Sequence, residues 1–199
     1  MPTPWLGRIR RTGQLTVFNK AGAWGSALTA AIATFNGLSF GVRLVATDKE
    51  SEANIVAKLS DGKETYPYFG QSIAVDFQAD DLHGRSRTLV DGKRMEIFFA
   101  VAFLPGKVKD PTAGQKEVVT LHELIHCAGL NGLLPSGAQA PNDDHDSSGI
   151  MYPQMMRDGN GLIEYLHEKG ASAMPPIRVG SQTQCKMRML WAGAECKVN

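Results

Sequence analysis

The chain has 199 residues, with 21 lysines and arginines against 20 aspartates and glutamates. That length is most simply one domain, and it suffices to bury a core without disulfide or metal support. The balanced charge gives no electrostatic reason to expect nucleic acid or an anionic membrane surface as a partner. No apolar run reaches the ~20 residues that span a bilayer, so we expect no transmembrane segment.

The N-terminus and the three cysteines leave the cellular compartment open. Residues 1–17 contain no apolar h-region of the kind that marks a secretory signal peptide. The chain is therefore leaderless, exported by another route, or begins after processing. Three thiols cannot all pair within one chain. A Cys185–Cys196 disulfide in an oxidising compartment and two unpaired cysteines in a reducing one are both compatible with the sequence.

Hydrophobic periodicity predicts a sheet and one helix in the first half of the chain. Strands are expected at residues 13–19, 40–47, 53–60, 71–77 and 94–106. A helix is expected at 21–37, where Trp24, Leu28, Ala31, Ile32 and Phe35 recur at helical spacing. This order indicates an α+β fold, with a twisted mixed sheet of about five strands backed by a helix.

The second half begins with a long predicted helix at residues 110–130. A loop rich in glycine, proline and aspartate follows at 131–149, and a short helix is expected at 161–169. From Ala171 onward the sequence has no clear period. We therefore expect a main domain over residues 1–170 and a C-terminal extension over 171–199 that packs on this domain or trails from it.

The long helix contains "HELIH", in which His122 and His126 are four residues apart. At 3.6 residues per turn their side chains lie about 40° apart on one face, so both imidazoles can bind one metal ion. Zinc is the default metal for nitrogen ligands at this spacing. Glu123 is rotated by about 100° from His122, where it can take a proton from water instead of binding the metal. The neighbouring positions are apolar, and imidazoles buried there without partners would be costly.

Zinc hydrolases use three protein ligands, so another residue must complete the site. Among the other histidines, His83 lies in a polar loop and His167 on the exposed face of a predicted helix. His145, in "NDDHD", is the candidate third ligand. The carboxylates of Asp143, Asp144 and Asp146 are the alternatives, and the same acidic loop could instead be solvated or hold Ca²⁺.

The segments "HELIHCAGL" and "SGIMYP" resemble the metzincin metalloproteases, and within them the matrixin-like branch. Gly129 matches the family's glycine, at which the chain turns back toward the metal. Met151, Tyr152 and Pro153 match its methionine turn, which implies that Met151 lies beneath the metal and that Tyr152 and Pro153 line the substrate pocket. The resemblance covers roughly residues 12–168. It departs at Gly132, where the family has its third histidine, and a long insertion would deliver His145 instead.

The resemblance implies a zincin-like fold, with an active-site helix and a C-terminal helix after the methionine turn. It also implies a zinc-dependent endopeptidase that uses His122, His126 and His145 as ligands and Glu123 as general base. The strand containing Phe98–Phe103 would be the edge strand that pairs with a protein or peptide substrate. We expect a monomer. Two other classes stay open: a zinc-stabilised binding or structural module with weak catalysis, and a zinc amidase acting on cell-wall peptides.

Overall fold

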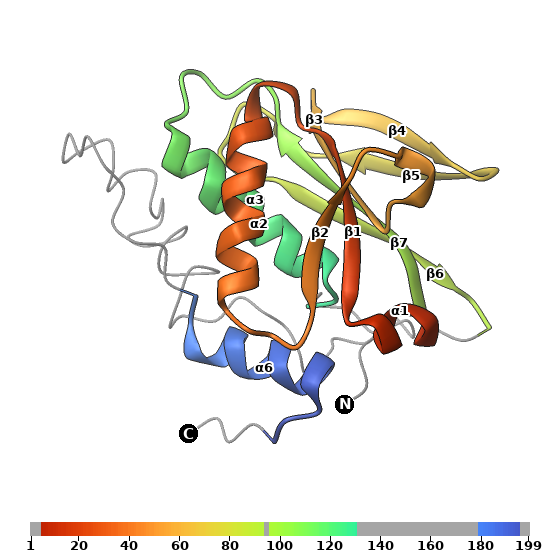
Figure 1. Cartoon of the computed structure of the whole chain (residues 1–199). Helices are drawn as coiled ribbons and strands as arrows, with labels where there is room; N and C mark the ends of the chain where they lie inside the picture. Colours follow the sequence, from red (N-terminus) through yellow and green to blue (C-terminus); the bar gives the residue numbers. More distant parts are fainter. Residues whose placement is uncertain (1–4, 94–95, 131–178, 196–199) are drawn as a thin grey trace.

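The computed structural model describes residues 5–93, 96–130 and 179–195. Its centre is a five-stranded mixed sheet of strand order β2-β1-β3-β7-β6 (Figure 1). The strands are β1 (Gln14–Lys20), β2 (Arg43–Thr47), β3 (Ile55–Ser60), β6 (Arg85–Asp91) and β7 (Glu96–Pro105). The first four in spatial order run parallel, whereas β6 pairs antiparallel with β7 at one edge. The predicted α+β class, with a mixed sheet of about five strands, is confirmed at this level.

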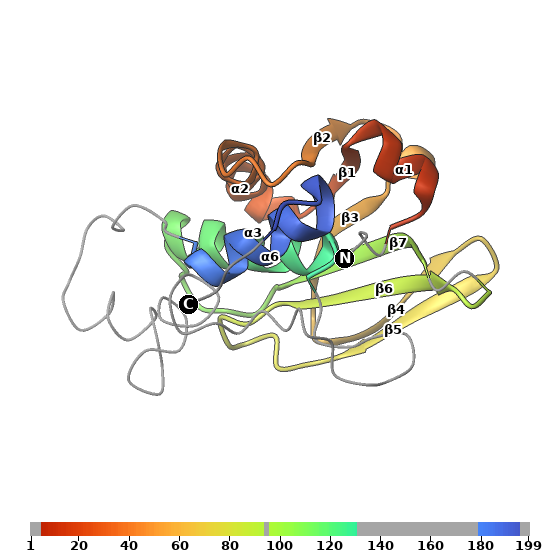
Figure 2. The same ribbon diagram turned by 90° about the horizontal axis from the view of Figure 1, so that it is seen from below.

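Helices cover one face of the sheet, and a separate β-hairpin covers the other (Figure 2). The helical elements are α1 (Gly7–Thr12), η1 (Gly22–Trp24), α2 (Gly25–Gly37), η2 (Glu50–Glu52), α3 (Ala113–Cys127) and α6 (Ser181–Ala192). The hairpin consists of β4 (Lys63–Tyr68) and β5 (Gln71–Asp76). None of the helices in these described ranges has the length and apolar character that crossing a bilayer requires.

Strand β7 separates two hydrophobic clusters because its side chains alternate between the faces of the sheet. Ala100, Ala102 and Leu104 belong to the cluster shared with the helices, whereas Val101 and Phe103 belong to the one shared with the hairpin. A strand buried on both faces reads as a continuous apolar run, which is how residues 97–104 appear in the sequence.

The prediction that Phe98–Phe103 lies in an edge strand is wrong. These residues lie in β7, which pairs with β3 on one side and with β6 on the other. The edge of the sheet on this side is β6, a strand that the sequence did not predict. Its polar start, Arg85-Ser86-Arg87, suits a strand that is less completely buried than β7.

Two further differences concern the hairpin and the C-terminus. The strand expected at 71–77 exists as β5, but it pairs with the unpredicted β4 instead of joining the main sheet. A helix, α6, lies within the segment that has no clear period, and its Met187, Leu190 and Trp191 are buried in the helix-side cluster. The helix expected at 161–169 lies outside the described residues.

Candidate metal centre

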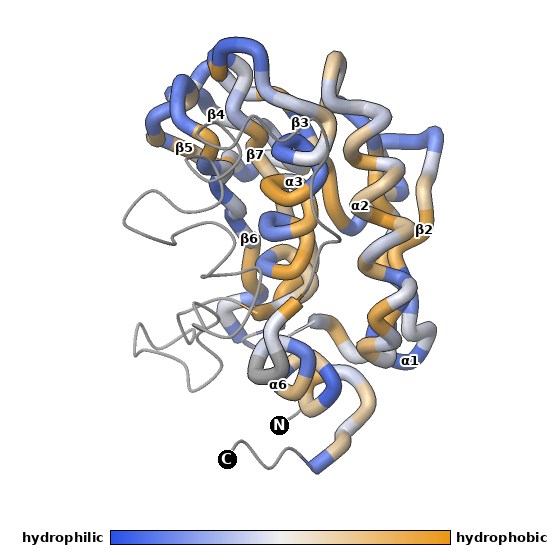
Figure 3. The backbone as a smooth tube through the Cα atoms, turned by 90° about the vertical axis from the view of Figure 1, so that its left-hand side faces the viewer, coloured by the Kyte–Doolittle hydropathy of each residue, from blue (hydrophilic) through white to orange (hydrophobic). Residues whose placement is uncertain are grey.

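Helix α3 carries the predicted site, and a side-chain cap fixes the residue at which it begins. Thr112 is the N-cap: its side-chain oxygen accepts a hydrogen bond from the Gln115 backbone N–H, and the Gln115 side chain accepts one from the Thr112 N–H. This reciprocal capping box satisfies two backbone donors that the helix leaves open. Further along, α3 is buried without interruption from Val118 to Ile125. Figure 3 shows this helix beside α2 and β6, with hydrophobic stretches separated by hydrophilic ones.

His122 and His126 converge on one point, as their spacing predicts. Their Nε2 atoms are 3.0 Å apart, and the two rings are nearly perpendicular, at 76°. Two nitrogens bound to one tetrahedral zinc at ~2.0–2.1 Å would be about 3.3 Å apart. A slight opening of the pair would therefore let both nitrogens bind the same ion.

The turn after α3 orients the second histidine. Gly129 has a φ of 113°, a conformation that favours glycine, and its N–H donates to the carbonyl oxygen of His126. This turn brings the Leu130 carbonyl to 2.8 Å from Nδ1 of His126. An Nδ1–H donated to that carbonyl leaves the Nε2 lone pair facing His122, which is the usual arrangement of a metal-binding imidazole.

Glu123 lies beside the two nitrogens. Its side chain is buried, with only 3% of the residue exposed, and its Oε1 is 4.0 Å from Nε2 of His122. That distance is too long for a hydrogen bond. It nevertheless keeps the carboxylate close to the point on which the histidines converge, in the position that a proton acceptor for nearby water requires.

The two imidazole nitrogens and their orientation fit a zinc ion and would supply two of its ligands. Within residues 5–93, 96–130 and 179–195, no group of three or more His, Cys, Asp and Glu side chains is arranged to hold a metal. The predicted third ligand His145, its alternatives Asp143, Asp144 and Asp146, and the methionine-turn residues Met151, Tyr152 and Pro153 all lie outside the described residues. His83, expected on the surface, has 45% of its side chain exposed and its Nδ1 is 3.1 Å from Asp81.

Two ionisable groups near Glu123 have shifted pKa values. Burial raises the pKa of the Cys127 thiol well above its ordinary value, and the negative charge of Glu123 raises it further. Burial lowers the pKa of Arg87 on β6, as does neighbouring Arg85, whereas Glu123 acts in the opposite direction. Arg87 on β6 is therefore close enough to Glu123 for their charges to interact.

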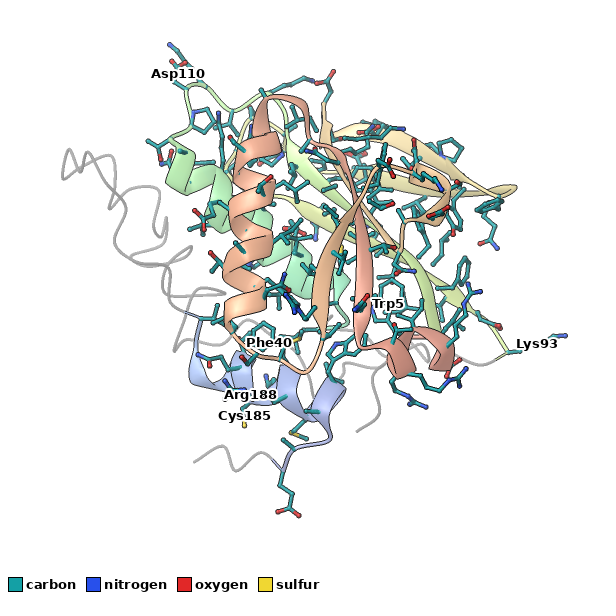
Figure 4. All side chains as sticks on the ribbon, viewed as in Figure 1. Trp5, Phe40, Lys93, Asp110, Cys185 and Arg188 are labelled. Atoms are coloured by element: carbon teal, nitrogen blue, oxygen red, sulfur yellow. The ribbon has the colours of Figure 1, made fainter. Side chains whose placement is uncertain are left out.

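Two tryptophans hold the C-terminal end of α3, and sequence reasoning did not predict either contact. The indole N–H of Trp5 donates to the Cys127 carbonyl at 3.0 Å, and that of Trp191 donates to the Ala128 carbonyl at 2.9 Å. The last carbonyls of a helix have no partner within the helix. Here they are satisfied by the N-terminal segment, where Figure 4 shows Trp5, and by α6.

The sequence matches no protein-family model, and it matches no curated protein.

Proposed function

We propose that this protein is a zinc-dependent endopeptidase. The observation that carries the proposal is the convergence of the His122 and His126 Nε2 atoms to 3.0 Å, with the buried carboxylate of Glu123 beside them. His122 is buried and His126 is partly buried, and the contact of His126 Nδ1 with the Leu130 carbonyl leaves its Nε2 facing His122, as metal binding requires.

In the proposed mechanism, His122, His126 and His145 would hold a zinc ion, which would supply Lewis-acid activation of the scissile carbonyl and of water. Glu123 accepts the proton from the attacking water and then transfers it to the nitrogen of the departing amine. The Leu130 carbonyl keeps His126 in the tautomer that can bind the metal. The buried position of Glu123 limits the orientations of its carboxylate, so the proton acceptor is held in place before substrate arrives.

The proposed route for substrate is the outer edge of β6, which pairs with no further strand among the described residues. An extended peptide can add to an open sheet edge through main-chain hydrogen bonds, with its side chains pointing alternately to the two faces. Strand β6 is such an edge, and it packs beside α3. This proposal replaces the Phe98–Phe103 strand as the substrate-pairing element.

The metzincin likeness and the remainder of the site belong to the same proposal. We propose that His145 completes the zinc ligands, with Met151, Tyr152 and Pro153 as the methionine turn. Supporting observations are the HELIH helix, the sharp turn at Gly129 and the zinc-compatible nitrogen pair.

The decisive experiment uses the full chain loaded with zinc and a diverse peptide library. Glu123→Gln should keep the zinc and lose about 10²–10⁴-fold in peptide hydrolysis, because the amide cannot act as a base. Glu117→Gln is the matched control, since Glu117 lies on the same helix and accepts a hydrogen bond from Thr34 at 2.8 Å, away from the histidines. It should hydrolyse peptides like the wild type.

Metal content gives the second half of the test. His122→Ala and His126→Ala should each bind zinc far more weakly, because they remove a nitrogen from a site of few ligands. A wild-type chain that binds zinc but cleaves no peptide would favour the zinc-stabilised module. A chain whose zinc binding survives both histidine substitutions would have its metal elsewhere.

A further inference from the structure

Gly84, in the loop before β6, lies directly against the side chain of Glu123. A Cβ atom placed on Gly84 would be 2.5 Å from Cγ, 2.8 Å from Cδ and 2.8 Å from Oε1 of Glu123. Real Cβ atoms essentially never approach another heavy atom this closely. The three nearest atoms all belong to Glu123, so the side chain of the proposed general base occupies the space that any other residue at position 84 would need.

The strand register explains why the backbone of Gly84 meets α3. In β6, Ser86 is opposite Ala102 and Thr88 is opposite Ala100. Directly opposed residues point to the same face of a sheet, and Ala100 and Ala102 belong to the cluster on the helix side. Gly84 is two residues before Ser86 and meets Glu123 from this same side.

Gly84 differs from the glycines that the backbone itself requires. A Cβ on Gly62 would be 2.4 Å from the carbonyl oxygen of Phe77, and one on Gly106 would be 2.9 Å from that of Ser60. Those neighbours are backbone atoms and cannot move without deforming the fold. The atoms that face Gly84 are the end of a side chain, so a larger residue there would displace the carboxylate and leave the backbone in place.

We propose that Gly84 is a positioning residue for Glu123. Because it has no side chain, the loop before the edge strand closes onto the carboxylate and limits where it can lie relative to the two histidines. The effect of Gly84 on catalysis rests on the proposed peptidase function, whereas the contact between Gly84 and Glu123 does not. Gly84 would thus connect β6, the proposed substrate-binding strand, with Glu123, the proposed proton acceptor.

The first test compares Gly84→Ala with Gly92→Ala in the zinc-loaded full chain. Gly92 lies in the β6–β7 turn next to Lys93, which Figure 4 shows at an outer tip of the molecule, and an added Cβ there meets nothing within 4 Å. Gly84→Ala should bind zinc like the wild type and lose about 10²-fold in kcat with little change in KM, since small displacements of a catalytic group have effects of that order. Gly92→Ala should retain both constants. An unchanged kcat in Gly84→Ala would overturn the proposal.

The second test needs neither metal nor activity. In the metal-free full chain, Gly84→Ala should lower the midpoint of thermal unfolding in the wild-type background. In the Glu123→Ala background it should have no effect, because Cγ, Cδ and Oε1 are then absent. This double-mutant cycle isolates the contact between the two positions.

Equal losses in the two backgrounds would show that Gly84 acts elsewhere and would overturn the proposal. If the wild type hydrolysed no peptide, the proposed function would fail and the catalytic role of Gly84 with it. The unfolding cycle would still decide whether the contact exists, so the two failures are distinguishable.

Discussion

Three polar groups at the C-terminal end of α3 each meet a specific partner. His126 faces the Leu130 carbonyl, and the carbonyls of Cys127 and Ala128 accept hydrogen bonds from Trp5 and Trp191. Unpaired polar groups in such a setting would destabilise the fold by about 1–3 kcal/mol each. The end of the helix that carries the second histidine is therefore fixed by contacts from both ends of the described chain.

Cys127 should be chemically inert in the folded protein. It is free and fully buried, and burial together with Glu123 raises the pKa of its thiol. The thiolate is the reactive form, and a raised pKa makes it scarcer at neutral pH. Iodoacetamide should therefore leave Cys127 unmodified in the native chain and alkylate it fully in denaturant, as measured by mass spectrometry of its peptide.

Cys185 provides the internal comparison for this labelling. It is disulfide-bonded, and it should become reactive only after reduction, while Cys196 lies outside the described residues. Rapid alkylation of Cys127 without denaturant would mean that the C-terminal end of α3 opens readily, which would contradict the anchoring by the two tryptophans.

At the residue scale, the sequence predicted what depends on local geometry. The convergence of His122 and His126 follows from the pitch of one helix, and the turn at Gly129 follows from the conformational freedom of glycine. The contacts of Glu123 with Gly84, and of Trp5 and Trp191 with the helix end, join segments that are distant in the sequence. No periodicity within a single element could have revealed them.

At the element scale, the start of α3 offers a direct measure of what its capping box contributes. Thr112→Ala removes the side-chain acceptor for the Gln115 N–H and should lower the free energy of unfolding by about 1 kcal/mol. Chemical denaturation of the full chain would measure this. Thr29→Ala on α2 is the matched control, because Thr29 is exposed and its hydroxyl donates to the Gly25 carbonyl within the helix. It should be neutral or slightly stabilising, since alanine is the better helix former.

The identity of the edge strand also belongs to the element scale, and the sequence predicted it incorrectly. Residues 97–104 are apolar on both faces because two layers cover β7, which is typical of an interior strand. Strand β6 is the last strand of the described sheet and is only partly buried. Its start is the polar run Arg85, Ser86 and Arg87, so the sequence shows no alternation of apolar and polar residues there. Strand β4 contains Pro67, which is compatible with a strand only at an edge or in a small hairpin.

At the scale of the whole molecule, α6 returns the C-terminal part of the chain to the first elements. Ala192 approaches Gly41 closely, and the Arg188 guanidinium donates to the Leu38 carbonyl at 3.2 Å. The sequence pattern did contain this helix, because Thr183, Met187, Leu190 and Trp191 recur at helical spacing and Gly193 ends it in the left-handed conformation. Its polar positions weakened the pattern, and its packing partners could not be read from the sequence.

The contribution of α6 to global stability can be measured with a matched pair of methionines. Met187 is 0% exposed within the helix-side cluster, whereas Met189, two residues later on the same helix, is only partly buried. Met187→Ala should lower the free energy of unfolding by about 2–5 kcal/mol, because it leaves a cavity in the helix-side cluster. Met189→Ala should cost about 1 kcal/mol or less. Urea unfolding followed by tryptophan fluorescence would report both values, and equal small losses would mean that α6 is not part of the cooperative core.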